Sequence, residues 1–484
     1  MIFRLIMRLF LWIILSILAH QVFADRLNVL FIVSEDNGPE LGCYGAPVQT
    51  PYIDQLAEEG TLFWNAYVAQ AGCSQSRAAF LTGLYPHQNG QIGLATWKYR
   101  MFSPRIPNVV RTLKEAGYRT GIIGKLHVNP ESAFPFDYKA IPGANFSRKA
   151  MGGYSKFAQQ FIASSKRPFF LQVNYPDAHR PFLRSVDGLP KKPLVPLDVD
   201  PLPFIGIKHP ELRQQSADYY NCMMRLDSYV GDLLRVLDES GKSSKTVVVY
   251  IGDHGADVMR GKRTSYEGGV RVPMIIRWPG SRAGQVRKEL VSLLDLYPTF
   301  CEIAKTKVPP NLPGRALKPI LFGEVPNWRK YLFTEFHLHS NHNPWPQRTV
   351  RDQRYKLIYN PLAGSVNPGY KFTMGKKFFT ASEDQLLAYA SDKVRKAYKL
   401  MKEPPIYELY DLKEDPHEFN NIFENAELET TRTRLISELK SWQLETGDVL
   451  TNPENARRLF DLVISLGTDK REVLDYSFMN RSLR

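Results

Sequence analysis

Cysteine is scarce in this sequence. The chain of 484 residues contains only four cysteines, and their spacing fits neither a metal site nor a disulfide framework: Cys43, Cys73, Cys222 and Cys301. Small disulfide-rich folds and zinc-finger proteins are therefore excluded. Internal repeats and low-complexity segments are also absent, which excludes solenoids and repeat arrays.

Signatures of nucleic-acid binding are missing as well, although the chain is basic. The formal net charge of +14 suggests an acidic partner, and nucleic acid, anionic lipid and sulfated glycan all qualify. No zinc-finger spacing, RNA-binding motif or dense basic helix favours nucleic acid, so we expect no nucleic-acid partner. The hydrophobic content of 43% and charged content of 23% are typical of a globular protein.

The N-terminus has the pattern of a secretory signal peptide. Arg4 and Arg8 precede an apolar run at 9–19, and Ala24 offers a small residue for cleavage. An uncleaved anchor is the alternative, although the run is short for a membrane span. We therefore predict a signal peptide at 1–24 and a secreted or periplasmic protein (lysosomal in a eukaryote), with no stable membrane insertion after cleavage.

Short apolar runs alternate with helical patterns over residues 25–326. We predict strands at 27–33, 118–124, 167–175, 245–251 and 272–277. We predict helices at 52–60, 107–116 and 211–239. This alternation predicts an α/β catalytic domain with a large, mainly parallel sheet flanked by helices.

From residue 327 onward the sequence changes character. Short alternating segments at 354–359 and 406–412 predict strands, and a final helix is expected at 428–445. We predict a smaller C-terminal α+β subdomain, residues 327–484, with an antiparallel sheet.

Polar side chains recur directly after the predicted strands. Four strands are each followed by charged or imidazole groups: Glu35 and Asp36, Lys125 and His127, His179, and Asp253 and His254. Because ligands of open α/β sheets bind at the carboxyl ends of strands, we expect these groups to converge. A hard cation would hold the paired carboxylates ionised, and many carboxylates favour Ca²⁺ over Mg²⁺. Solvated acids and ordinary surface lysines and histidines are the plainer alternative.

The stretch Cys73-Ser-Gln-Ser-Arg77 precedes a short helix predicted at 78–84. A cysteine at a helix N-terminus lies where free N–H groups and the helix dipole favour anions. Such a position lowers a thiol pKa, so Cys73 is a candidate nucleophile. An ordinary half-buried cysteine in a loop is the alternative.

Residues 73–87, CSQSRAAFLTGLYPH, resemble the signature of the sulfatase family, with Gln75 where the family has proline. The segments Gly124–His127 and Gly261–Pro273 resemble two further family motifs. The resemblance implies an alkaline-phosphatase-like sandwich. It also implies that a formylglycine-generating or equivalent maturation enzyme converts Cys73 to formylglycine.

The resemblance implies a metal site too. Its ligands are Glu35, Asp36, Asp253 and His254, with the modified Cys73 completing the sphere around Ca²⁺, or less favourably Mg²⁺. The family usually has aspartate where Glu35 stands, and Asn or His at the position of His254.

The catalytic roles follow from the same motifs. The resemblance assigns Arg77 to support of the nucleophile, Lys125 and Lys262 to the sulfate, His127 to the formylglycine and His179 to protonation of the leaving group. The transferred sulfuryl group spreads negative charge over its oxygens, and fixed cations stabilise that charge.

The implied reaction has two stages. One hydroxyl of the hydrated aldehyde, activated by the metal ion and a carboxylate for which we favour Asp253, attacks sulfur. His179 protonates the departing nitrogen or oxygen. The remaining hydroxyl then loses its proton and sulfate leaves, a route that a plain cysteine or serine lacks.

Further segments, among them Arg119–Val128, Phe134–Asp137 and Trp442–Thr446, resemble the sulfamidase branch, the N-sulfoglucosamine sulfohydrolases. This likeness implies a sulfated saccharide partner and removal of N-linked sulfate from glucosamine in heparan-type chains. His337 and His339 would line the sugar pocket. The alternatives are an O-sulfatase on another sulfated polysaccharide, a phosphatase of the same superfold and a non-catalytic secreted glycan-binding protein. Homodimer formation stays open.

Overall fold

The computed structural model describes residues 26–324, 327–375 and 378–480. The predicted signal peptide at 1–24 lies outside these ranges. Within them, no helix combines the length and the apolar character that crossing a membrane requires.

The main sheet has eight strands within the described residues, in the order β10-β2-β9-β7-β1-β6-β4-β5. The five strands from β7 to β5 are mutually parallel, whereas β9 runs antiparallel to both of its neighbours. The strands span Asn28–Ser34 (β1), Thr61–Phe63 (β2), Arg119–Gly124 (β4), Tyr138–Ala140 (β5), Phe169–Tyr175 (β6), Thr246–Gly252 (β7), Met274–Arg277 (β9) and Gln285–Arg287 (β10). The predicted large, mainly parallel sheet is confirmed.

The strand expected at 272–277 is divided at Pro273. Because proline has no N–H to donate to a ladder, the run breaks there, and β9 begins at Met274. Val272 belongs instead to a second sheet of three short strands, β11 (Val291–Ser292), β3 (Ala66–Tyr67) and β8 (Arg271–Val272).

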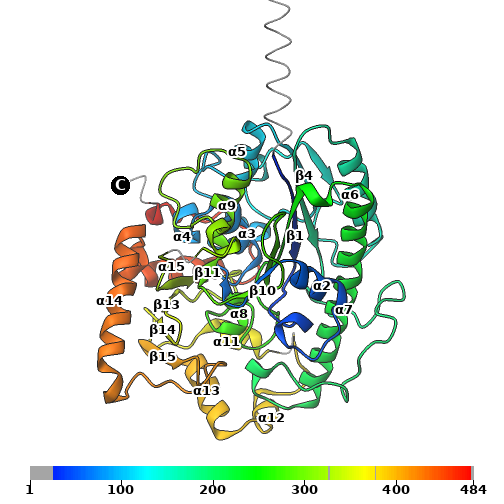
Figure 1. Ribbon diagram of the computed structural model, residues 1–484. Helices are drawn as coiled ribbons and strands as arrows, with labels where there is room; N and C mark the ends of the chain where they lie inside the picture. The colour runs from blue at the N-terminus through cyan, green and yellow to red at the C-terminus, as the bar shows by residue number, and fades with distance from the viewer. Residues whose placement is uncertain (1–25, 325–326, 376–377, 481–484) are drawn as a thin grey trace, which may run out of the picture.

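Helices cover both faces of the main sheet (Figure 1). Leu30 and Ile32 of β1 pack in the core cluster that contains α2, α6 and α7. The alternate residues Val29, Phe31 and Val33 pack in the cluster that contains α3, α5 and α9. The helices of this part of the chain span Pro51–Glu59 (α2), Cys73–Thr82 (α3), Pro86–Asn89 (α4), Val109–Glu115 (α5), Gly153–Ser164 (α6), Pro210–Glu239 (α7), Glu267–Val270 (α8), Leu296–Ile303 (α9) and Lys318–Leu321 (α10).

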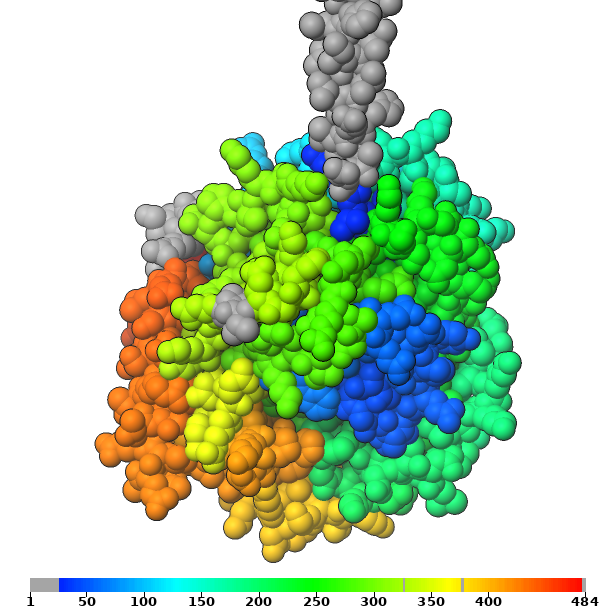
Figure 2. All heavy atoms as spheres, in the orientation of Figure 1, coloured from blue at the N-terminus to red at the C-terminus, as the bar shows by residue number. Residues whose placement is uncertain are grey.

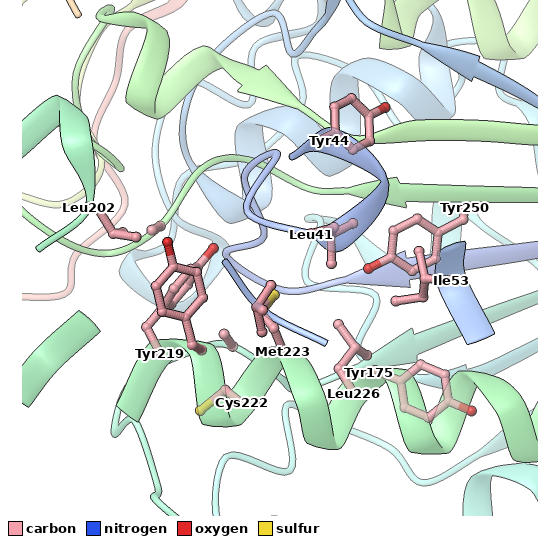
Figure 3. Packing of buried hydrophobic residues seen from close by; sticks show 14 of the residues in the cluster. Leu41, Tyr44, Ile53, Tyr175, Leu202, Tyr219, Cys222, Met223, Leu226 and Tyr250 are labelled. Carbon is pink, nitrogen blue, oxygen red and sulfur yellow. The ribbon is translucent and has the colours of Figure 1, made fainter. Parts of the chain in front are cut away.

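The long helix α7 anchors one face of the core. His209 caps its first turn by accepting a hydrogen bond from the Glu211 N–H, and a proline occupies the first helical position. Its buried stripe includes Tyr219, Met223 and Leu226, which face the strands (Figure 3). The prediction of a long amphipathic helix is confirmed.

The C-terminal part contains the predicted antiparallel sheet. Its strands are β12 (Leu332–Phe336), β13 (Gln347–Arg351), β14 (Tyr355–Tyr359) and β15 (Tyr407–Asp411). Helices α11 (Pro368–Thr373), α12 (Glu383–Leu387) and α13 (Asp392–Lys402) lie between β14 and β15 in the sequence, and α14 (Glu429–Thr446) packs on the sheet. In Figure 2 the C-terminal residues, in orange, form one side of the molecule.

The expectation that the chain ends in one helix was wrong. A further helix, α15 (Pro453–Leu466), follows α14. It is capped by Asn452, begins with a proline and buries Ala456, Leu459 and Val463, three apolar positions at helical spacing.

A buried carboxyl beside the core gives a stability prediction. Burial raises the pKa of Glu40 to about 7, while its Oε2 accepts a hydrogen bond from the Tyr219 hydroxyl at 3.2 Å. Since the unfolded carboxyl ionises near pH 4.5, the folded state loses stability as the pH rises from there to about 7. We expect Glu40→Gln to match the parent below pH 4.5 and to exceed its unfolding free energy by about 3 kcal/mol at pH 8. Denaturant unfolding at both pH values measures this, with exposed Glu58→Gln as control; a difference independent of pH would contradict it.

Candidate active site

The ends of four adjacent parallel strands bring the predicted polar groups together. Glu35 and Asp36 follow β1, and Asp253 and His254 follow β7, its direct neighbour. The Asp36 N–H donates to Asp253 Oδ1 at 2.9 Å, which joins the two loops. A Cβ on Gly252 would lie 1.8 Å from the Asn37 carbonyl oxygen, so only glycine permits this close approach.

Asp36 itself has a strained backbone. Its φ of 50° lies in the left-handed region, which residues with a Cβ seldom adopt. His127, on the loop after β4, has a φ of 60°. Such conformations persist where the surroundings fix them, and they are frequent at functional sites.

Cys73 is the first residue of α3, and Gly72 is its N-cap. The helix-terminal position that the sequence indicated is therefore confirmed. Its Sγ lies 3.3 Å from His254 Nε2 and 4.0 Å from Asp36 Oδ1. The expected low thiol pKa was wrong, because burial raises the pKa of Cys73 more than the neighbouring lysines lower it. None of the four cysteines forms a disulfide.

Arg77, one helical turn after Cys73, binds both acidic loops. Its Nε donates to Asp253 Oδ2 at 3.0 Å and a terminal nitrogen donates to Glu35 Oε2 at 2.9 Å. The other terminal nitrogen donates to the Lys125 carbonyl at 2.9 Å and to Asn174 Oδ1 at 2.8 Å. The sequence analysis did not identify Asn174, although a polar amide within the apolar run at 167–175 indicates a buried hydrogen-bonding role.

The two predicted lysines each pair with one of the two adjacent carboxylates. Lys125 Nζ forms an ion pair with Glu35, and Lys262 Nζ lies 3.0 Å from both Asp36 oxygens. Burial alone would raise the pKa of Glu35, but Lys125 and Arg77 hold it well below its usual range. Burial raises the pKa of Asp36 despite Lys262. Asp36 therefore lacks enough positive charge to offset its desolvation.

The donor set fits a hard divalent cation. One ligand atom from each of Glu35, Asp36, Cys73 and His179 lies within 4.8 Å of the others, and Cys73, Asp253 and His254 form an overlapping group. The Nδ1 of His254 lies 2.9 Å from the Gly255 carbonyl, which can only accept, and Nε2 lies 3.2 Å from Asp36 Oδ1. The tautomer with its proton on Nδ1 would leave the Nε2 lone pair for a cation. The three carboxylates supply oxygen ligands of the kind that Ca²⁺ and Mg²⁺ bind, and the imidazole would add one nitrogen ligand.

The two remaining histidines that the sequence predicted to be catalytic, His179 and His127, have different surroundings. His179 Nδ1 donates to the Arg180 carbonyl at 2.6 Å, and burial together with Lys262 lowers its pKa to about 3. Both ring nitrogens of His127 are buried without a hydrogen-bond partner. Burial and Lys125 lower the pKa of His127, so its ring is neutral.

His337 and His339, predicted at the sugar pocket, have different surroundings. His337 is fully buried, and its ring nitrogens lie 2.9 Å from Gln70 Oε1 and 3.1 Å from an Arg348 terminal nitrogen. His339 Nε2 has no partner, and Lys262 and Arg263 add to the burial that lowers the pKa of His339. Of the two, His339 has a ring nitrogen without a hydrogen-bond partner.

Gln75, where the related signature has proline, ties helix α3 to the segment that carries these histidines. Its Nε2 donates to the Leu338 carbonyl at 2.7 Å and to the Ile92 carbonyl at 3.3 Å. Gln70 donates to the same Leu338 carbonyl at 2.9 Å. Gln75 therefore adds a buried hydrogen-bonded link beside Cys73.

Asp257 is a further charged residue of the site that the sequence reasoning missed. It forms an ion pair with Arg263 and lies 3.9 Å from both Lys262 Nζ and Arg180 Nε. These cations hold its pKa well below the usual range against the effect of burial. No strand precedes Asp257 directly, so the expectation that functional groups lie at the carboxyl ends of strands did not identify it.

Comparison with known proteins gives matches over most of the chain. A family model described as sulfatase matches residues 27–306, and one described as N-sulphoglucosamine sulphohydrolase, C-terminal, matches residues 252–363. N-sulphoglucosamine sulphohydrolase of Homo sapiens is 31% identical over 466 residues, covering 87% of this chain and 90% of that protein. An ulvan-active sulfatase of Formosa agariphila is 30% identical and covers 88% and 82%, respectively.

Solved structures show the same fold. A protein solved with its substrate D-glucosamine-2-N,6-O-disulfate has a TM-score of 0.68 at 20% identity, covering 87% of this chain and 98% of that one. A phosphonate monoester hydrolase of Silicibacter pomeroyi has a TM-score of 0.63 at 19% identity, covering 87% and 96%. The predicted alkaline-phosphatase-like architecture is confirmed, and proteins of different activity share it.

Proposed function

The chain belongs to the sulfatase family, and on this premise we propose that it removes sulfate from sulfated saccharides, with N-linked sulfate of glucosamine in heparan-type chains as the preferred target. Family membership makes it a hydrolase of sulfate esters or sulfamates. The observation that carries the proposal is the meeting of Cys73, three carboxylates and two lysines at one edge of a parallel sheet.

Two matches support the N-sulfate preference. The C-terminal family model and the human relative both carry the name N-sulphoglucosamine sulphohydrolase. The net charge of +14 suits a polyanionic chain. The similarly related ulvan-active sulfatase favours the second candidate, an O-sulfatase on another sulfated polysaccharide.

The proposed nucleophile is formylglycine made from Cys73 by a maturation enzyme. Burial raises the pKa of the thiol, so the unmodified side chain stays protonated and is a poor nucleophile. When present, the hydrated aldehyde supplies one hydroxyl for attack on sulfur and a second for release of sulfate. The N-terminus of α3 would stabilise negative charge at this position.

The proposed metal is Ca²⁺, held by Asp36, Asp253, His254 and Glu35 beside the modified Cys73. Bound there, the ion supplies Lewis acidity and lowers the pKa of a ligated hydroxyl. Glu35 is the least available ligand, because its two oxygens already accept from Arg77 and Lys125.

The remaining roles belong to the cations and histidines. Lys125 and Lys262 would bind the sulfate oxygens and neutralise the charge that develops on them. His179 would deliver a proton to the leaving nitrogen or oxygen. Because burial and Lys262 lower its pKa, the negative charge of a bound sulfate is needed to favour its protonated form. His127, with two unpartnered nitrogens, would contact the modified side chain at position 73.

A substrate panel tests the proposal. Purified protein with converted Cys73 should release inorganic sulfate from N-sulfated glucosamine at least about tenfold faster, in kcat/KM, than from 6-O-sulfated glucosamine. Ion chromatography of released sulfate measures this, with Cys73→Ala as the blank. Faster release from the O-sulfated sugar would assign the chain to the O-sulfatases.

The same panel addresses the non-catalytic alternative. A protein whose Cys73 remains a thiol after co-expression with a maturation enzyme, and which binds heparan oligosaccharides without releasing sulfate, would be a glycan-binding protein. Export after removal of residues 1–24, a secreted, periplasmic or lysosomal location, and dimer formation stay predictions.

A further inference from the structure

A phenylalanine outside the family motifs covers the site. Phe146 lies in the loop between β5 and α6, and its ring stacks on the imidazole of His179 with centroids 3.6 Å apart and planes 8° from parallel. The Lys125 ammonium lies 5.1 Å from the centroid of the same ring. One aromatic ring therefore contacts groups at the ends of both β6 and β4.

A buried arginine fixes this stack. Arg148 is 1% exposed, and its guanidinium donates to the backbone carbonyls of both Phe146 and His179. Its Nε donates to Asp177 Oδ1 at 2.9 Å. Asp177 is held in turn by Arg225, whose Nε and terminal nitrogen each lie 2.8 Å from an Asp177 oxygen. The planar fork of arginine thus joins the two stacked residues through their main chains.

The loop that carries Phe146 has its own internal support. Asn145 and Arg148 have φ values of 48° and 52°. The Asn145 side chain donates to the Lys149 carbonyl and accepts from the Lys149 N–H, both at 3.0 Å. The backbone is thus held in a left-handed conformation that places Phe146 inward, which indicates a constrained role for the loop.

We propose that Phe146 forms the leaving-group wall of the site and that Arg148 is a positioning residue, which together fix the His179 imidazole for proton transfer to the departing atom. The inference rests on the proposed role of His179. Since Nδ1 is engaged by the Arg180 carbonyl, Nε2 is the nitrogen left to serve the leaving group. Rotation of the imidazole would break its stacking contact, so the ring holds Nε2 in one direction and excludes water from that face.

The dependence of rate on the leaving group tests the proposal without knowledge of the natural sugar. Basic leaving groups need a proton in the transition state and weakly basic phenols do not. Phe146→Leu, which keeps apolar volume without the stack, should raise the kcat/KM ratio of 4-nitrophenyl sulfate to phenyl sulfate by about tenfold or more. Phe146→Tyr, which keeps the stack, should restore the parent ratio.

Controls separate this role from a structural one. Lys149→Gln, an exposed change in the same loop, should leave the ratio unchanged, and thermal unfolding should show that each variant is folded. Arg148→Lys, which keeps the charge but loses the fork, should shift the ratio in the direction of Phe146→Leu. An equal loss on both substrates, or no change in the Phe146→Leu ratio, would overturn the inference while the proposed function stands. A parent enzyme that releases sulfate from none of these compounds or sugars would overturn both.

Discussion

Replacing Cys73 with alanine is expected to abolish sulfate release while leaving the fold intact. The side chain at position 73 starts α3 and contacts His254 and Asp36, so a converted aldehyde there would be the group that attacks sulfur. The two nearby amines are not free to act as nucleophiles, because Lys125 and Lys262 are paired with Glu35 and Asp36. We expect kcat/KM to fall by about four orders of magnitude or more, as when a catalytic nucleophile is removed elsewhere.

Two measurements accompany this variant. Mass spectrometry of the parent peptide that contains position 73 should show formylglycine. As a control, Cys43→Ala replaces a half-buried cysteine outside the site and should keep the activity of the parent. Residual activity of Cys73→Ala within about tenfold of the parent would show that the reaction does not pass through position 73. Full activity in protein whose Cys73 remains a thiol would exclude formylglycine in particular.

The strand ends were predictable because of how parallel sheets are built. Runs such as 27–33 and 245–251 are apolar on both faces, which identifies buried parallel strands, and parallel strands end at a common edge. That rule alone predicts that Glu35, Asp36 and the pair Asp253 and His254 lie close together. The placement of Cys73 needed the motif, since its helix follows a short strand of another sheet.

What the sequence could not indicate depends on contacts between distant segments. The antiparallel direction of β9 follows from its chain path, which composition does not encode. Asp257 lies beside Arg263 and Lys262 through the course of a loop rather than after a strand. The pKa of Cys73 depends on how completely other elements bury the start of α3, and that burial outweighs the helix terminus. Helix α15 could have been predicted from the sequence, because Asn452 is a typical N-cap residue and the apolar residues that follow have helical spacing.

Removal of the proposed Ca²⁺ ion is expected to lower both activity and stability. Glu35, Asp36 and Asp253 are fully buried within one cluster, and Asp36 has a raised pKa despite Lys262, so the cluster needs further positive charge. An ion that binds only the folded state adds about 2.7 kcal/mol of stability at a free concentration of about one hundred times its Kd. Protein dialysed against a chelator should therefore unfold at a lower temperature, and Ca²⁺ should restore the unfolding temperature and sulfate release more fully than Mg²⁺.

The identity of the ligands can be tested within the same chain. Asp36→Asn removes a charge from the cluster and should abolish the calcium-dependent rise in unfolding temperature, whereas Glu40→Gln neutralises a buried carboxyl only four residues away and should keep it. The contrast matters because both substitutions relieve buried charge, but only Asp36 faces Asp253, His254 and Lys262. If calcium raises the unfolding temperature of both variants equally, the ion is bound elsewhere. If neither Ca²⁺ nor Mg²⁺ raises the unfolding temperature of the parent, Lys125, Lys262 and Arg77 alone stabilise the carboxylates, and the metal proposal fails.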